Sequence, residues 1–132
     1  MTIVSILVAT VIAFIFSSIY YSPALMWNIW QKSVGIKMDS KSFTWWKMVK
    51  IFGTTFLLYF IQYFILAFFM SRVGADTVSE AIIISIMSWM LIESSALVKG
   101  MYEQRNILGT LIWVFEDLIR IIIWALIIVW MM

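Results

Sequence analysis

The sequence predicts an all-α integral membrane protein, a four-helix bundle with a short interfacial helix after the first span. Apolar runs of about 20 residues, the length that crosses a ~30 Å hydrocarbon core, recur four times. Hydrophobic residues make up 64% of the chain and charged residues 12%, whereas soluble domains carry about 25% charged residues. A soluble domain this small has too much surface to bury so many apolar side chains. We therefore expect a single transmembrane domain over residues 1–132, in contact with the lipid bilayer.

The first predicted span covers residues 2–22. From Thr2 to Tyr21 there is no formally charged residue, and the length matches one membrane crossing. A cleaved signal peptide would instead have a basic start, a shorter apolar stretch and a small-residue cleavage site. These features are missing, so the segment is interpreted as a span. Pro23 fixes its own φ and disfavours helix at Ser22, so the helix should bend or restart there.

A short apolar segment from Ala24 to Trp30 follows the proline. It is too short to span a membrane, and tryptophans prefer the interface between lipid and water. We therefore expect a helix that lies in the interface. The next connection, residues 32–50, is a Lys-rich loop with five lysines against one aspartate.

The other three predicted spans cover residues 51–71, 81–98 and 107–130. The two loops on one side of the membrane together hold seven Lys or Arg, and the loop on the other side holds only Arg72. Cytoplasmic loops carry the excess of positive charge. This rule places the Lys-rich loop 32–50 in the cytoplasm of a multi-pass cell-membrane protein, with both termini outside.

The composition excludes several functional classes. The chain has no cysteine and no histidine, so it has no thiol chemistry and lacks the commonest metal ligand. No phosphate loop or nucleophile–base pair is present in the sequence either. We therefore expect no enzymatic activity, no cofactor and no metal site. A net charge of +2 without a clustered basic face also argues against nucleic-acid binding.

Four ionisable residues lie within the predicted spans: Glu93 in the third, and Glu116, Asp117 and Arg120 in the fourth. A charge at a helix centre costs at least ~2.5 kcal/mol, so such residues normally face the bundle interior and are paired. Arg120 is four residues from Glu116 and three from Asp117, which places the three side chains on one helix face. Within this helix, one guanidinium leaves one carboxylate in surplus.

The depth of each residue along its helix suggests which side chains meet. Glu116 and Asp117 lie ~14–15 Å from the cytoplasmic end of their span, and Gln62 lies ~16 Å along the second span, at ~1.5 Å per residue. Glu93 lies ~7–8 Å along the third span by the same count. We therefore predict an intramembrane polar cluster of Glu116, Asp117, Arg120 and Gln62, with Glu93 one turn nearer the cytoplasm.

This cluster supports two hypotheses. The first is a non-enzymatic accessory or structural subunit of a membrane complex or homo-oligomer, in which the charges fix helix register or dock a partner subunit. The alternative is a small proton- or cation-coupled transporter that uses the membrane-embedded carboxylates. The small multidrug-resistance proteins are four-helix proteins of similar size, but they rely on a glutamate in the first helix. The first span here has no acidic residue.

Short motifs carry a resemblance to a known family. The first span closes with Tyr20-Tyr21-Ser22-Pro23, and Trp27 and Trp30 follow. The third span holds Trp89, and the connection after it reads Met101-Tyr102-Glu103-Gln104-Arg105-Asn106. The pattern resembles DUF1761, a family of small bacterial and archaeal membrane proteins known only as a domain of unknown function. The resemblance implies a four-helix membrane fold and supplies no activity.

The chain departs from the family pattern in one motif. The family's usual glycine ahead of the aromatic pair is replaced by Ser17 or Ser18. The charges of the fourth span are not among the residues that carry the resemblance. If the resemblance holds, those charges are particular to this protein or its close relatives.

Overall fold

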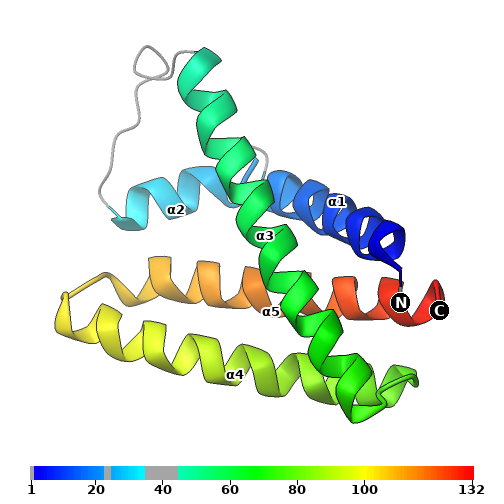
Figure 1. The fold of residues 1–132 in the computed structure, drawn as a ribbon. Coiled ribbons are helices and arrows are strands. Elements are labelled where there is room, and N and C mark those ends of the chain that lie inside the picture. Colours follow the sequence, from blue (N-terminus) through cyan, green and yellow to red (C-terminus); the bar gives the residue numbers. More distant parts are fainter. Residues whose placement is uncertain (1, 23–24, 35–44) are drawn as a thin grey trace.

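The computed structural model describes residues 2–22, 25–34 and 45–132. Pro23 and much of the predicted Lys-rich loop lie outside the described residues. Five helices make up the described part of the chain: α1 (Ile3–Tyr20), α2 (Trp27–Val34), α3 (Trp45–Val73), α4 (Val78–Tyr102) and α5 (Ile107–Trp130) (Figure 1). The all-α prediction is confirmed, and a short helix follows the first long one.

Three of these helices, α1, α3 and α4, are long and apolar enough to cross a membrane by length and composition, where the sequence predicts four spans. The fourth long helix, α5, has 24 residues. That is about 36 Å at ~1.5 Å per residue, which also suffices to cross. It differs from the others because Glu116, Asp117 and Arg120 occupy its middle.

Local sequence explains where several helices begin and end. Thr77 and Glu80 form a capping box at the start of α4, each side chain bonding to the backbone of the other residue. α1 ends at Tyr20, and α2 begins at Trp27. These two bounds bracket Ser22, where the proline-containing sequence predicts an interruption.

α5 is the central helix of the fold. It contacts α1, α2 and α4. The end of α1 pairs with the beginning of α5, because the hydroxyl of Tyr20 donates to the carbonyl of Ile112 at 2.9 Å. Ile6 and Ile128, from the opposite ends of these two helices, belong to one core cluster. α1 and α5 are therefore antiparallel, and the two chain ends lie at the same end of the protein (Figure 1).

Small residues allow α1 to approach α5 closely. Ser5, Ala9, Ala13 and Ser17 are four residues apart along α1, and all four are buried. A stripe of small side chains lets two helix backbones come together. The last member of the stripe, Ser17, faces the middle of α5.

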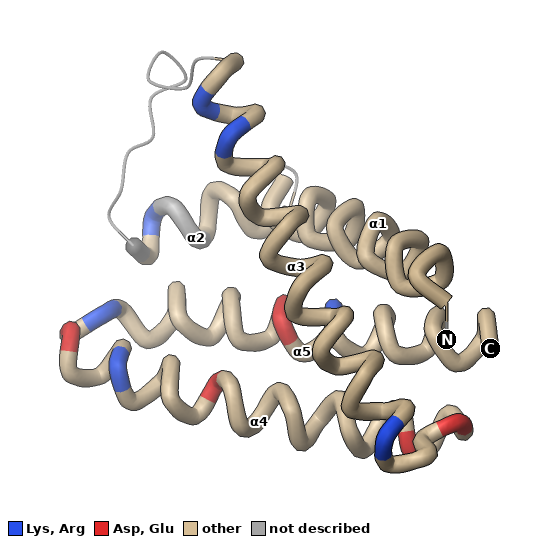
Figure 2. The backbone as a smooth tube through the Cα atoms, in the orientation of Figure 1, with Lys and Arg blue, Asp and Glu red and all other residues tan. Residues whose placement is uncertain are grey.

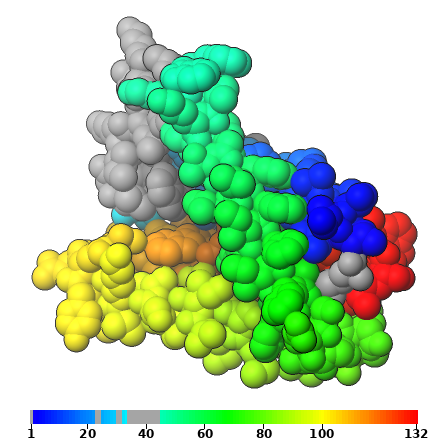
Figure 3. All heavy atoms as spheres, viewed as in Figure 1, coloured from blue at the N-terminus to red at the C-terminus, as the bar shows by residue number. Residues whose placement is uncertain are grey.

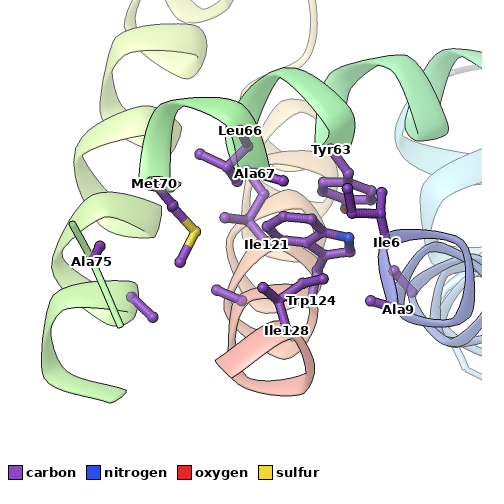
Figure 4. Packing of buried hydrophobic residues seen from close by; sticks show 13 residues of the cluster. Ile6, Ala9, Tyr63, Leu66, Ala67, Met70, Ala75, Ile121, Trp124 and Ile128 are labelled. Atoms are coloured by element: carbon purple, nitrogen blue, oxygen red, sulfur yellow. The ribbon is translucent and has the colours of Figure 1, made fainter. Parts of the chain in front are cut away.

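α3 lies diagonally across the layer formed by the other long helices (Figures 1 and 3). Its second half packs on α5 through Tyr63, whose ring stacks on Trp124 with centroids 4.8 Å apart. Leu66 and Met70 continue the same buried side of α3 (Figure 4). The apolar core therefore lies toward the end of the protein where the chain termini are.

The outer surfaces of α1, α3 and α4 are strongly apolar. Large hydrophobic side chains such as Leu57, Phe68 and Leu91 are exposed on them. Charged residues are grouped mainly at helix ends and in the turns, apart from positions in the middle of α4 and α5 (Figure 2). Helices that are apolar on their exposed faces suit a lipid environment.

Candidate functional site

The ionisable residues of α5 point into the protein. Glu116 is 1% exposed and Arg120 is 3% exposed, and Asp117 is partly buried. Glu116 and Arg120 fall on the same stripe of α5, at four-residue spacing, as the buried Trp124 and Ile128. The helix thereby keeps its charges among the other helices and leaves mostly apolar side chains outside.

Arg120 is the centre of the cluster. One of its terminal nitrogens, Nη2, lies 2.5 Å from Oδ1 of Asp117, and the other, Nη1, lies 3.4 Å from Oε2 of Glu116. Its Nε donates to the hydroxyl of Tyr63 at 2.8 Å. The guanidinium carbon is 3.9 Å from the ring centroid of Tyr59, a cation–π distance. Arg120 thus links α5 to α3.

The two carboxylates of α5 also accept hydrogen bonds from neutral donors. Ser17 of α1 donates its hydroxyl to Oε1 of Glu116. Trp113, one turn before Asp117 on α5, donates its indole N–H to Oδ2 at 2.9 Å. The cluster therefore joins α1, α3 and α5 through side chains that the membrane interior alone would leave unsatisfied.

Glu93 brings a third carboxyl group to the cluster from α4. It is 4% exposed. Among charged residues, Asp117 has the strongest electrostatic effect on its carboxyl group, and Glu116 and Arg120 act on it as well. Its Oε2 is buried and has no hydrogen-bond partner among the described residues. Three carboxyl groups therefore share one guanidinium, so the surplus of acid is larger than α5 alone indicates.

Gln62 is placed differently. It lines a groove of about 260 Å³ between α3 and α4, together with residues such as Ser88 and Leu91. Among the described residues, no hydrogen bond links Gln62 to the charge cluster. Its neighbour Tyr63 lies on the buried side of α3 and makes the contact with Arg120.

Three residues that bond to the charges were not predicted from the sequence as members of the cluster: Ser17, Tyr63 and Trp113. Each of them stands at a helical spacing that could have indicated its place. Ser17 continues the small-residue stripe of α1, and Tyr63 begins a buried stripe that continues at Leu66, Ala67 and Met70. Trp113 is one helical turn from Asp117, a spacing that brings two side chains together.

A cavity adjoins the cluster. Its volume is about 580 Å³, and it lies between α1, α3 and α5 with Trp27 of α2 on one side. Ser17, Tyr59 and Trp113 are part of its wall, and each of them contacts a charged member of the cluster. Within the described parts of the chain, no three His, Cys, Asp or Glu side chains are placed to hold a metal ion.

Long apolar helices around a buried charge cluster define a small helical protein with membrane-span-like helices. The family model for Protein of unknown function (DUF1761) matches residues 4–129. The chain therefore belongs to this family, and the resemblance inferred from the short motifs is confirmed. No curated protein and no solved structure shows a significant match to the chain.

Proposed function

We propose that the chain is a multi-pass membrane protein and a small proton- or cation-coupled transporter, with all four long helices crossing the bilayer. The observation that carries this proposal is the buried carboxyl group of Glu93. It lies beside Asp117 and has an oxygen without a hydrogen-bond partner in the described residues. The protein is not an enzyme in this proposal.

The direction of the charged side chains supports a fourth crossing by α5. Its acidic pair and Arg120 face inward, so lipid would meet mainly apolar side chains. The exposed Lys47 and Lys50 at the start of α3 favour the cytoplasmic side for that end of the bundle. With four crossings, both termini of a cell-membrane protein then lie outside.

The chemistry follows from the balance of charge. Arg120 neutralises one carboxylate, and three carboxyl groups lie around it. An unpaired carboxylate in a low-dielectric interior is costly, so the surplus groups need a proton or another cation. A group that must bind a cation and can release it to either side has the property that coupled transport requires.

The charges of α5 are paired within the chain, which weakens one argument for the accessory-subunit hypothesis. A charge that lacks a partner within its own chain would attract a second subunit. Here Glu116, Asp117 and Arg120 bond to each other and to Ser17, Tyr63 and Trp113 of the same chain. The pairing of these three residues does not depend on a second subunit, so within the described cluster only Glu93 still supports that argument.

The test is a pH-jump experiment on proteoliposomes adsorbed to a solid-supported membrane. Wild-type protein should give a transient current, because embedded carboxyl groups gain or lose protons. Glu93→Gln combined with Glu116→Gln should reduce the displaced charge at least tenfold. Glu103→Gln is the control, because Glu103 lies in the turn between α4 and α5 and is exposed. Absence of a wild-type current, or an unchanged current in the double variant, would refute proton coupling by these carboxyl groups.

A homo-oligomer or an accessory subunit is the second candidate, and the groove between α3 and α4 favours it. Gln62 and Ser88 place polar side chains in that otherwise apolar groove, and such side chains join helices in membranes. Because the chain has no cysteine, Leu91→Cys can be cross-linked alone, with the exposed Val11→Cys on α1 as control. Dimers at position 91 only would support this candidate, and a monomeric mass in mild detergent would oppose it.

A further inference from the structure

The cavity beside the charge cluster has an unusually aromatic wall. Ten of the described residues line its volume of about 580 Å³, a size within the range of small-molecule sites. Six of the ten are aromatic: Phe14, Tyr21, Trp27, Phe52, Tyr59 and Trp113. They come from four separate parts of the fold, so the wall depends on the tertiary structure. Flat aromatic faces bind organic groups by contact and attract cations through their electron-rich faces.

Negative charge lies directly behind this wall. Ser17 bonds to Glu116 and Trp113 bonds to Asp117, so one side chain separates the cavity from each carboxylate. Arg120 lies on Tyr59, but its charge is matched by the contacts with these same two carboxylates. When ionised, the α5 cluster carries a net charge of −1, and Glu93 adds further acid.

The described basic residues near this end of the fold do not reverse the negative sign of the cluster. Among the described residues, no lysine or arginine lines the cavity. Arg105 lies 5.8 Å from the ring centroid of the wall residue Trp113, but it is paired with Glu103 at 2.5 Å. Lys50 is exposed and lies 5.7 Å from the centroid of the Trp46 ring, and Lys47 is exposed as well. The field inside an apolar cavity is dominated by the nearest charges, because water screens those on the surface.

We propose that this cavity binds a hydrophobic organic cation, with the aromatic side chains holding its apolar groups and the carboxylates attracting its charge. The inference rests on the proposed transport function, for which it names the class of substrate. Binding of an organic anion is disfavoured because the acidic cluster would repel its charge. A small inorganic ion does not need a wall in which six of the ten described residues are aromatic.

The test compares two ions of nearly the same shape and opposite charge, tetraphenylphosphonium and tetraphenylborate. Binding is measured by equilibrium dialysis of the purified protein in a neutral detergent. Quenching of the fluorescence of Trp27 and Trp113, which line the cavity, provides a second readout. Tetraphenylphosphonium should bind at least tenfold more tightly than tetraphenylborate. Equal binding of the two ions would overturn the charge argument, and no binding of tetraphenylphosphonium would overturn the proposed site.

Two neighbouring threonines supply a matched pair of variants. Thr55 lines the cavity, and its hydroxyl donates to the carbonyl of Ile51 in its own helix. Thr54 is exposed and is not part of the wall. Thr55→Phe should fill the cavity and weaken tetraphenylphosphonium binding at least tenfold, whereas Thr54→Phe should leave it unchanged. Equal effects of the two variants would contradict binding in this cavity.

The two proposals fail in different ways. If wild-type protein gives a pH-jump current but does not bind tetraphenylphosphonium, the substrate class is wrong and the transport proposal remains. If tetraphenylphosphonium binds with the expected preference but no pH-jump current is seen, the cavity is confirmed as a cation site and proton coupling is refuted.

Discussion

The hydrogen bond from Arg120 to Tyr63 provides a sharp test of the charge cluster. Tyr63→Phe removes the hydroxyl that accepts from Nε of Arg120 at 2.8 Å. The ring remains, so the stacking on Trp124 is retained. Tyr63 is fully buried and Arg120 is 3% exposed. No bulk water can reach Nε to replace the lost acceptor.

Two typical hydrogen-bond energies set the range of the stability that Tyr63→Phe should remove. Hydrogen bonds to charged groups contribute about 1.5–3 kcal/mol in soluble proteins. Side-chain hydrogen bonds in membrane proteins average ~0.6 kcal/mol and reach ~1.7 kcal/mol. Since this bond is buried and one partner is charged, we expect Tyr63→Phe to lower the free energy of unfolding by about 1.5 kcal/mol.

The matched control is Tyr20→Phe, which removes a hydroxyl that donates to the neutral carbonyl of Ile112. Tyr20 is only partly buried, so Tyr20→Phe should lower the free energy of unfolding by about 0.5 kcal/mol. Both variants can be measured by reversible unfolding in mixed micelles of dodecyl maltoside and dodecyl sulfate. If Tyr63→Phe costs no more than Tyr20→Phe, the hydroxyl of Tyr63 does not satisfy Arg120.

Three further predictions use the same unfolding assay. Arg120→Met should lower the free energy of unfolding by about 3–5 kcal/mol, because it leaves three buried or partly buried carboxyl groups without their cation. A decrease of less than about 1 kcal/mol would contradict the described pairing. Thr77→Ala should cost ~1 kcal/mol through loss of the cap. The hydrogen bond from the Thr77 hydroxyl holds the pKa of Glu80 below its ordinary value, so this stabilisation is complete above that ordinary value and is lost as the pH falls below it. Thr77→Ala should therefore also weaken the dependence of stability on pH in the acid range. An added Cβ meets nothing within 4 Å at either Gly53 or Gly74, so the effect of alanine depends on the backbone alone. Gly53→Ala within α3 should raise the free energy of unfolding by about 0.5–1 kcal/mol. Gly74 has a φ of +71°, so Gly74→Ala should lower the free energy of unfolding by about 1–2 kcal/mol.

Interactions within one helix were predictable from the sequence. The separations of Glu116 and Asp117 from Arg120 predict their contact with it because helical geometry is fixed. The all-α class follows in the same way from long apolar runs. The break after Tyr20 was predictable because proline restricts the residue before it. None of these inferences requires knowledge of how one helix lies against another.

Interactions between helices were harder to predict because depth alone does not give the rotation of a helix. Gln62 and Tyr63 have almost the same depth along α3, but the stripe that continues at Leu66 and Met70 makes Tyr63 the buried one. A depth count also depends on where the helix ends. α4 extends to Tyr102, four residues beyond the predicted span, which adds ~6 Å. By that count, Glu93 is nearly level with Asp117.

The position of α5 explains how one chain can hold these charges at all. Lipid cannot satisfy an arginine and two acids in the middle of a helix. α1 approaches through its stripe of small residues and supplies Ser17, and α3 crosses at Tyr63. α4 closes the remaining side, but with another acid, Glu93, where a neutral or basic residue would have completed the pairing. A cluster built only to hold helices together has no need of that third carboxyl group. The presence of Glu93 is therefore the strongest argument that the cluster also binds a proton or another cation reversibly.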